Sequence, residues 1–141
     1  MDTQKKTLIT VEATVNAPVA KVWEYWTSPE HITQWNNASE DWHTPSATND
    51  LREGGKFTSR MEAKDGSLGF DFWGIYDTVN VHEFIAYTLG DDRKVSIRFT
   101  TEGDVTKVEE SFEAESENSI EMQQFGWQAI LNNFKKYTEA N

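Results

Sequence analysis

One stretch decides the fold: residues 119–140, which read SIEMQQFGWQAILNNFKKYTEA. Placed at 100° per residue, its apolar residues share one broad arc: Met122, Gly126, Trp127, Ala129, Ile130, Leu131, Phe134 and Tyr137. A surface helix needs an apolar stripe of little more than 100°, whereas this arc spans about 200°. We therefore predict a long C-terminal helix that is covered on more than one side and against which the upstream chain packs.

Upstream of this helix, apolar and polar residues alternate over short runs, which is typical of half-buried strands. The pattern predicts strands at residues 7–16, 57–64, 70–81, 84–89, 95–99 and 105–115. A change of apolar parity predicts a bulge at residues 77–79. Two short amphipathic helices are expected to begin near Pro18 and Pro29, and residues 36–53 are expected to form a loop with a weak strand at 42–48.

This order of elements predicts an α+β fold in which a curved antiparallel β-sheet wraps around the long C-terminal helix. Two short helices follow the first strand. A chain of 141 residues that is 37% hydrophobic is long enough to form one folded domain, which we place at residues 1–141. The sheet and the long helix are expected to leave room between them.

Composition excludes several functions. The net charge of −11 argues against binding to nucleic acids or anionic membranes. Without cysteine there is no disulfide or thiol nucleophile, and no apolar run is long enough for a signal peptide or a membrane span, so we expect a cytoplasmic protein. His31, His43 and His82 lack the spacing of metal ligands, and we predict neither a metal site nor a cofactor.

Together, the sequence motifs resemble a known family: the one named after the activator of the heat-shock protein 90 ATPase, in the START/SRPBCC superfamily. The motifs that carry the resemblance are Ala17-Pro18 with Val22-Trp23, Trp35-Asn36, Asp41-Trp42, residues 49–57 (NDLREGGKF), 60–66 (RMEAKDG), 69–76 (GFDFWGIY) and 126–131 (GWQAIL). The resemblance implies the helix-grip fold of the birch pollen allergen, with an apolar cavity between the sheet and the long helix.

Three polar residues fall among apolar ones. Glu110 shares the parity of Val108, Phe112 and Ala114, so a regular strand would point it at the long helix, and Gln123 lies inside the apolar arc of that helix, near its start. A buried carboxylate is costly unless it is paired or protonated, and such groups cluster at functional sites. Glu110 is a weak candidate for a catalytic acid or base, and Tyr76 is a candidate to orient a ligand. The alternatives are a sheet-edge position for Glu110, a solvated first turn for Gln123 and a core position for Tyr76.

The leading hypothesis is a non-enzymatic or weakly enzymatic protein that binds a small hydrophobic ligand. The expected ligand-binding residues are Phe57, Met61, Phe72, Tyr76, Phe99, Glu110, Phe112, Met122, Gln123 and Ile130. The first alternative is a chaperone-interaction module, which the family name suggests. The second is an enzyme like the polyketide cyclases or hydrolases, which would need an acid or base inside the cavity.

A further expectation concerns the outer face of the sheet. Trp73 and Ile75 have the opposite parity to Phe72 and Tyr76, so they should point away from the helix. An exposed apolar pair of this kind predicts a weak homodimer, although a modest apolar patch is also normal on monomers.

Overall fold

The computed structural model describes residues 7–141 of the chain. The elements, in chain order, are β1 (Leu8–Val15), α1 (Val19–Thr27), α2 (Pro29–Trp35), β2 (Trp42–Asn49), β3 (Lys56–Ala63), β4 (Gly69–Asn80), β5 (Phe84–Leu89), β6 (Lys94–Glu102), β7 (Val105–Glu113) and α3 (Ile120–Ala140).

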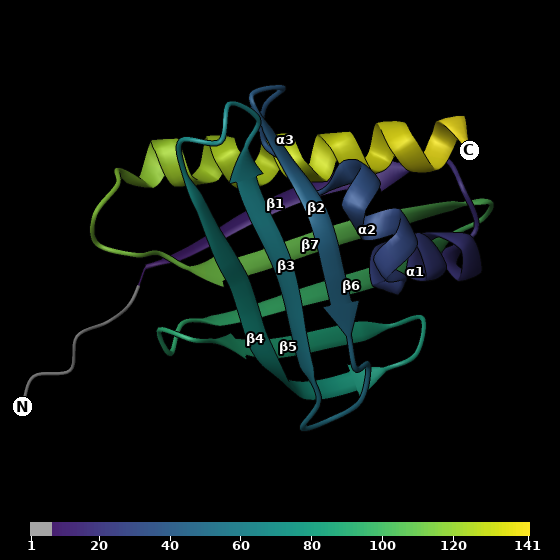
Figure 1. The fold of residues 1–141 in the computed structure, drawn as a ribbon. Coiled ribbons are helices and arrows are strands. Elements are labelled where there is room, and N and C mark those ends of the chain that lie inside the picture. The colour runs from purple at the N-terminus through teal and green to yellow at the C-terminus, as the bar shows by residue number, and fades with distance from the viewer. Residues whose placement is uncertain (1–6) are drawn as a thin grey trace, which may run out of the picture.

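The strands form one antiparallel sheet in the order β1-β7-β6-β5-β4-β3-β2. Figure 1 shows that the sheet is strongly curled, so that β2 and β3 cross in front of β1 and β7, and that the long helix α3 lies along β1 at one end. The short helices α1 and α2 close another side, near β6. This is the predicted helix-grip α+β fold, which is confirmed.

The packing of α3 differs along its length. Leu131, Phe134 and Thr138 are completely buried, whereas Met122 is 62% exposed. The predicted broad arc is therefore wrong at the start of the helix, because the sheet covers these first turns from one side only. Ser119 is the N-cap of the helix, because its hydroxyl accepts a hydrogen bond from the Met122 backbone N–H at 3.1 Å.

The C-terminal half of α3 packs on aromatic rings from the two short helices. The ring of Phe134 lies 4.8 Å from that of Trp26 and 5.0 Å from that of Trp35, both edge to face. The Trp35 indole N–H also donates to the carbonyl of Tyr25 at 2.9 Å. These contacts anchor the helix firmly at this end.

Strand β2 confirms the weak strand predicted at residues 42–48 within the expected loop, and it is a full strand of the sheet. It pairs with β3 over its length, with a register shift between His43 and Ser46. The run is polar and contains Pro45, so its own pattern is weak, but an edge strand with a bulge tolerates proline. The bulge predicted at residues 77–79 is confirmed, because the pairing of β4 with β5 shifts between Tyr76 and Thr78.

Within residues 7–141, no helix has the length and apolar character needed to span a membrane.

Candidate ligand-binding cavity

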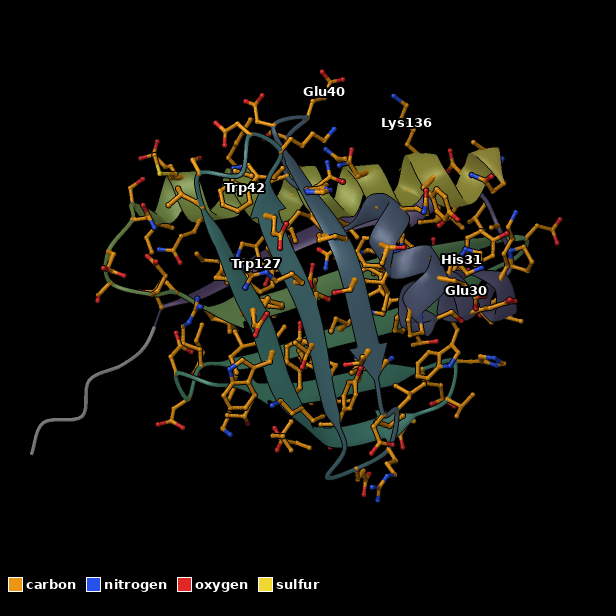
Figure 2. The ribbon with its side chains drawn as sticks, viewed as in Figure 1. Glu30, His31, Glu40, Trp42, Trp127 and Lys136 are labelled. Atoms are coloured by element: carbon orange, nitrogen blue, oxygen red, sulfur yellow. The ribbon has the colours of Figure 1, made fainter. Side chains whose placement is uncertain are left out.

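A cavity of about 420 Å³ lies between the first half of α3 and the inner face of the sheet. Its size falls in the range of small-molecule sites, which is about 300–1,000 Å³. Figure 2 shows Trp127 beneath α3, within the space that the sheet surrounds, whereas Lys136 points away from the sheet. The lining is mainly apolar and aromatic, and includes Trp26, Trp35, Phe57, Met61, Phe70, Phe72, Tyr76, Ile85, Tyr87, Trp127 and Ile130.

Most of the residues expected from the sequence line this cavity. They are Phe57, Met61, Phe72, Tyr76, Glu110, Met122, Gln123 and Ile130. Two others lie behind the wall, because larger rings cover them. The ring of Phe112 stacks under the indole of Trp127 at 3.9 Å, and the ring of Phe99 meets that of Trp26, a lining residue, edge to face at 6.0 Å.

Sequence reasoning missed several lining residues. Tyr87 alternates with Ile85 and Leu89 on β5, so the parity of that strand could have placed it on the inner face. Arg93 sits in the turn between β5 and β6, and no periodic signal pointed to it. Trp127 was assigned to the core of the helix arc, but its indole also forms part of the cavity wall.

The amide of Gln123 is used by the protein itself. Its Oε1 accepts from the Glu115 backbone N–H at 2.9 Å, and its Nε2 donates to the carbonyls of Glu115 and Asn118 at 3.1 and 2.9 Å. These bonds hold the loop between β7 and α3 against the first turn of the helix. We therefore assign Gln123 a structural task at the cavity end.

The hydroxyl of Tyr76 is also engaged. It donates to Oδ1 of Asn49 at 2.6 Å, and Nδ2 of Asn49 donates to the Thr27 carbonyl at 2.6 Å. This chain ties β4 to β2 and to the end of α1. Burial raises the pKa of Tyr76, so its hydroxyl stays protonated around neutral pH.

Glu110 has a different environment. Its side chain is on the inner face of β7, the residue is only 6% exposed, and within residues 7–141 no group forms a hydrogen bond with its carboxyl. Burial raises the pKa of Glu110 from its ordinary value of 4.5 to about 8. The predicted inward orientation of Glu110 is what the structure has, and the carboxyl is mostly protonated at neutral pH.

The histidines take part in packing. His31 stacks on Tyr25 at 3.9 Å, and its Nδ1 shares a hydrogen bond with the Tyr137 hydroxyl at 2.8 Å. His82 meets Trp23 edge to face at 5.9 Å. Among the residues that the structure describes, no group of three or more His, Cys, Asp or Glu side chains is placed to hold a metal ion.

A curled sheet gripping a long helix, with an apolar cavity between them, defines a helix-grip protein with room for a small molecule. The family model described as "Activator of Hsp90 ATPase homolog 1-like protein" matches residues 16–139. The chain belongs to this family. No curated protein sequence matches it significantly.

Solved structures agree with this assignment. The AHSA1-like protein from Aeromonas hydrophila is 42% identical, with a TM-score of 0.89 over 95% of this chain and 93% of its own. A protein from Cytophaga hutchinsonii is 58% identical, with a TM-score of 0.82 over 94% of this chain and 92% of its own. One from Nitrosomonas europaea, at 16% identity, a TM-score of 0.80 and 94% coverage of both chains, shares the fold.

Proposed function

We propose that this protein binds a small, largely apolar molecule in the cavity between α3 and the sheet. The observation that carries the proposal is a cavity of about 420 Å³, partly open to solvent and lined largely by aromatic side chains, in a chain of this size. Core packing normally leaves few voids larger than a water molecule, so a space of this volume is not ordinary packing. The family fold, which commonly binds hydrophobic ligands, supports the same reading.

Gly126 adds independent support. It lies within the N-terminal half of α3 and lines the cavity, and apart from its chain neighbours and the surrounding helix backbone no heavy atom lies within 4 Å of the position where a Cβ would stand. Glycine inside a helix costs about 1 kcal/mol relative to alanine. Neither a turn nor a close contact explains the glycine, whereas open space on the cavity side of the helix does.

Native mass spectrometry of protein purified from its own host tests the proposal. We expect an additional mass of a few hundred daltons, about the size that such a cavity encloses, which organic solvent removes. A protein that carries no such compound, and takes none up from an apolar extract of the same cells, would contradict the proposal.

The alternatives give other results in the same experiment. A chaperone-interaction module, which the family description suggests, would retain a chaperone as the bound mass. A cyclase-like or hydrolase-like enzyme would use Glu110, whose pKa of about 8 suits proton transfer near neutral pH. It would release the extracted compound in altered form. A cytoplasmic location belongs to this proposal too, and rests on the composition of the chain.

A further inference from the structure

On one wall of the apolar cavity, two polar groups have no hydrogen-bond partner in the protein. These are the carboxyl of Glu110 and the hydroxyl of Tyr87, both from buried residues, and within residues 7–141 neither forms a hydrogen bond. A buried polar group without a partner costs about 1–3 kcal/mol. Two such groups in one cavity indicate that a bound molecule supplies their hydrogen-bond partner.

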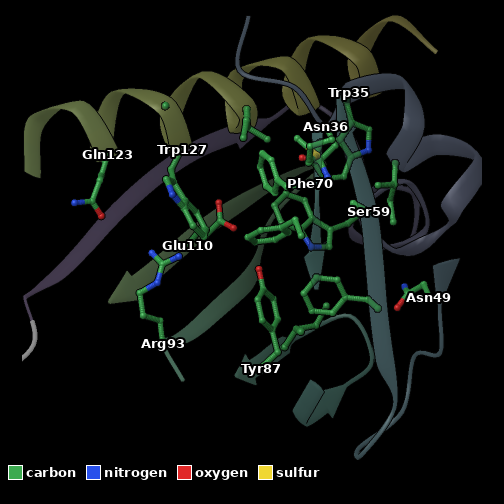
Figure 3. Close-up of a pocket in the computed structure, with 18 of the residues that line it drawn as sticks. Trp35, Asn36, Asn49, Ser59, Phe70, Tyr87, Arg93, Glu110, Gln123 and Trp127 are labelled. Atoms are coloured by element: carbon green, nitrogen blue, oxygen red, sulfur yellow. The ribbon is translucent and has the colours of Figure 1, made fainter. Parts of the chain in front are cut away.

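The sheet register brings the pair to one wall. Glu110 on β7 pairs with Ile97 on β6, which in turn pairs with Ile85 on β5. Tyr87 on β5 pairs with Val95 on β6, which in turn pairs with Phe112 on β7. Glu110 and Tyr87 therefore occupy neighbouring rows of the same face, on strands separated only by β6. Figure 3 shows the Glu110 carboxyl and the Tyr87 hydroxyl directed toward the same region of the cavity.

Three other polar groups in the lining already form hydrogen bonds within the protein. Gln123 and Tyr76 bond to the protein as described above, and Arg93 donates through Nε to Asp91 at 2.8 Å and through Nη1 to the Glu113 carbonyl at 3.4 Å. Within residues 7–141 the side chains of Ser59 on β3 and of Asn36 form no hydrogen bond, but both lie on the other side of the cavity from Glu110 in Figure 3. Glu110 and Tyr87 thus form one polar spot in an apolar and aromatic surrounding.

The charges around this spot select the ligand chemistry. A protonated carboxyl and a phenol are both hydrogen-bond donors. The Arg93 guanidinium lines the same cavity and opposes a cationic ligand, and its charge is already paired with Asp91 at 2.8 Å and so is not left over for an anionic ligand. A neutral ligand oxygen fits two converging donors without placing a new charge in an apolar site.

We propose that the cavity selects a neutral molecule with an apolar, ring-containing body and a carbonyl oxygen that accepts hydrogen bonds from Glu110 and Tyr87. The inference rests on the proposed function, since it names the class of ligand for the same cavity. The aromatic lining holds the body by stacking and edge contacts. The two donors fix which end of the molecule enters first.

Titration of Glu110 should then control binding. The groups that face it from neighbouring elements are Tyr87 on β5, Arg93 before β6, and Gln123 and Trp127 on α3, while its β1 neighbour is Val11. Burial raises the pKa of Tyr87 well above its usual value and Gln123 and Trp127 do not ionise, so Glu110 is the group among these that changes charge near pH 8.

Three matched probes test the ligand class: 2-acetylnaphthalene, which is a ketone; 2-ethylnaphthalene, its hydrocarbon counterpart; and 1-(2-naphthyl)ethylamine, a cation at neutral pH. Titration calorimetry at pH 6.5 should give the ketone about tenfold tighter binding than the hydrocarbon, because one or two hydrogen bonds of about 1 kcal/mol each are gained. The amine should bind more weakly than either. The preference for the ketone should weaken about threefold or more when the pH rises above 9, because the ionised Glu110 no longer donates whereas Tyr87 still does.

Single substitutions test which residues produce the preference for the ketone. Tyr87→Phe should reduce the ketone preference about threefold to tenfold and leave the hydrocarbon affinity unchanged, because it removes one donor. Glu110→Gln keeps a donor but does not ionise, so it should keep the preference and abolish its pH dependence. Glu109→Gln is the matched control, because Glu109 precedes Glu110 on β7 and lies 3.9 Å from Lys107 on the outer face of the sheet. It should change neither the ketone preference nor its pH dependence.

The possible results separate the two proposals. Equal binding of ketone and hydrocarbon, or tighter binding of the amine, would overturn the ligand class and leave apolar binding intact. A ketone preference that is reduced neither by Tyr87→Phe nor by the rise in pH would also overturn it. Failure of the unmodified protein to bind any of the three probes would contradict the proposed function itself.

Discussion

The two halves of helix α3 have different surroundings. In the C-terminal half, Leu131 and Phe134 are completely buried, and Phe134 is surrounded by the rings of Trp26 and Trp35. In the N-terminal half, Gly126 and Ile130 face the cavity, and Phe125 is 76% exposed. One continuous helix therefore passes from dense core to cavity wall.

This difference means that stability and binding can be changed separately. Removal of atoms from the packed half leaves a void that the core cannot fill, which lowers the free energy of unfolding. Addition of atoms to the cavity half fills existing space at little cost to the fold.

The largest effect should come from loss of the whole helix. A chain truncated after Ser119 leaves the inner face of the sheet without Leu131 and Phe134, so cooperative unfolding should be lost. Thermal melts followed by circular dichroism measure this. A single sharp transition in the truncated chain would show that the sheet does not depend on α3.

Single substitutions should distinguish the halves. Leu131→Ala should lower the free energy of unfolding by about 2–5 kcal/mol, because it creates a cavity in packed core. Ile130→Ala, one residue earlier on the cavity wall, should cost about 1 kcal/mol, since part of this side chain already faces open space. Urea denaturation of both variants gives the comparison, and equal losses would contradict the division of the helix.

Glu110 should make stability depend on pH. Its folded-state pKa, about 8, is raised above the ordinary 4.5, so its favourable contribution is fully present below 4.5 and is lost as the pH rises toward 8. The loss between pH 4.5 and pH 7 amounts to about 3 kcal/mol. Glu110→Gln should therefore be more stable than the unmodified protein at pH 7, and the advantage should shrink in acid.

Paired urea series of the unmodified protein and Glu110→Gln, from pH 4.5 to pH 8, measure this difference. Glu109→Gln serves as the control, because its carboxyl lies on the outer face near Lys107. Parallel curves for the unmodified protein and Glu110→Gln would mean that the Glu110 carboxyl is solvated.

The smallest effect concerns the outer face of the sheet. Trp73 is 38% exposed, and Nζ of Lys56 lies 4.7 Å from its ring. A weak homodimer through Trp73 and Ile75 stays a prediction. Changing both to Lys should suppress dimerisation in sedimentation velocity runs and leave the melting temperature nearly unchanged, whereas a dimer that persists would place the interface elsewhere.

Strand parity was the most informative part of the sequence. It placed Phe72, Tyr76 and Glu110 on the inner face, because a half-buried strand alternates strictly and every second side chain must point inward. Strand parity could not predict that the indole of Trp127 covers Phe112, because it gives the direction of a side chain and not the residues that pack over it.

The remaining differences have similar physical causes. Strand β2 carries almost no pattern of its own, since its structure depends on pairing with β3. Arg93 enters the cavity lining from a turn, where no periodicity exists, and the hydrogen bonds of Gln123 depend on a loop conformation that residue types do not specify.

Gly126 offers the most direct test of the central claim, which is that the cavity beneath α3 binds an apolar molecule. Quenching of tryptophan fluorescence by 2-acetylnaphthalene can be titrated for Gly126→Phe and for Gly126→Ala, because Trp26, Trp35 and Trp127 line the cavity. Both variants should fold, and Gly126→Ala should be about 1 kcal/mol more stable than the unmodified protein while it still binds. The account predicts that Gly126→Phe fills the space and lowers the affinity at least tenfold, and equal affinities for the two variants would contradict it.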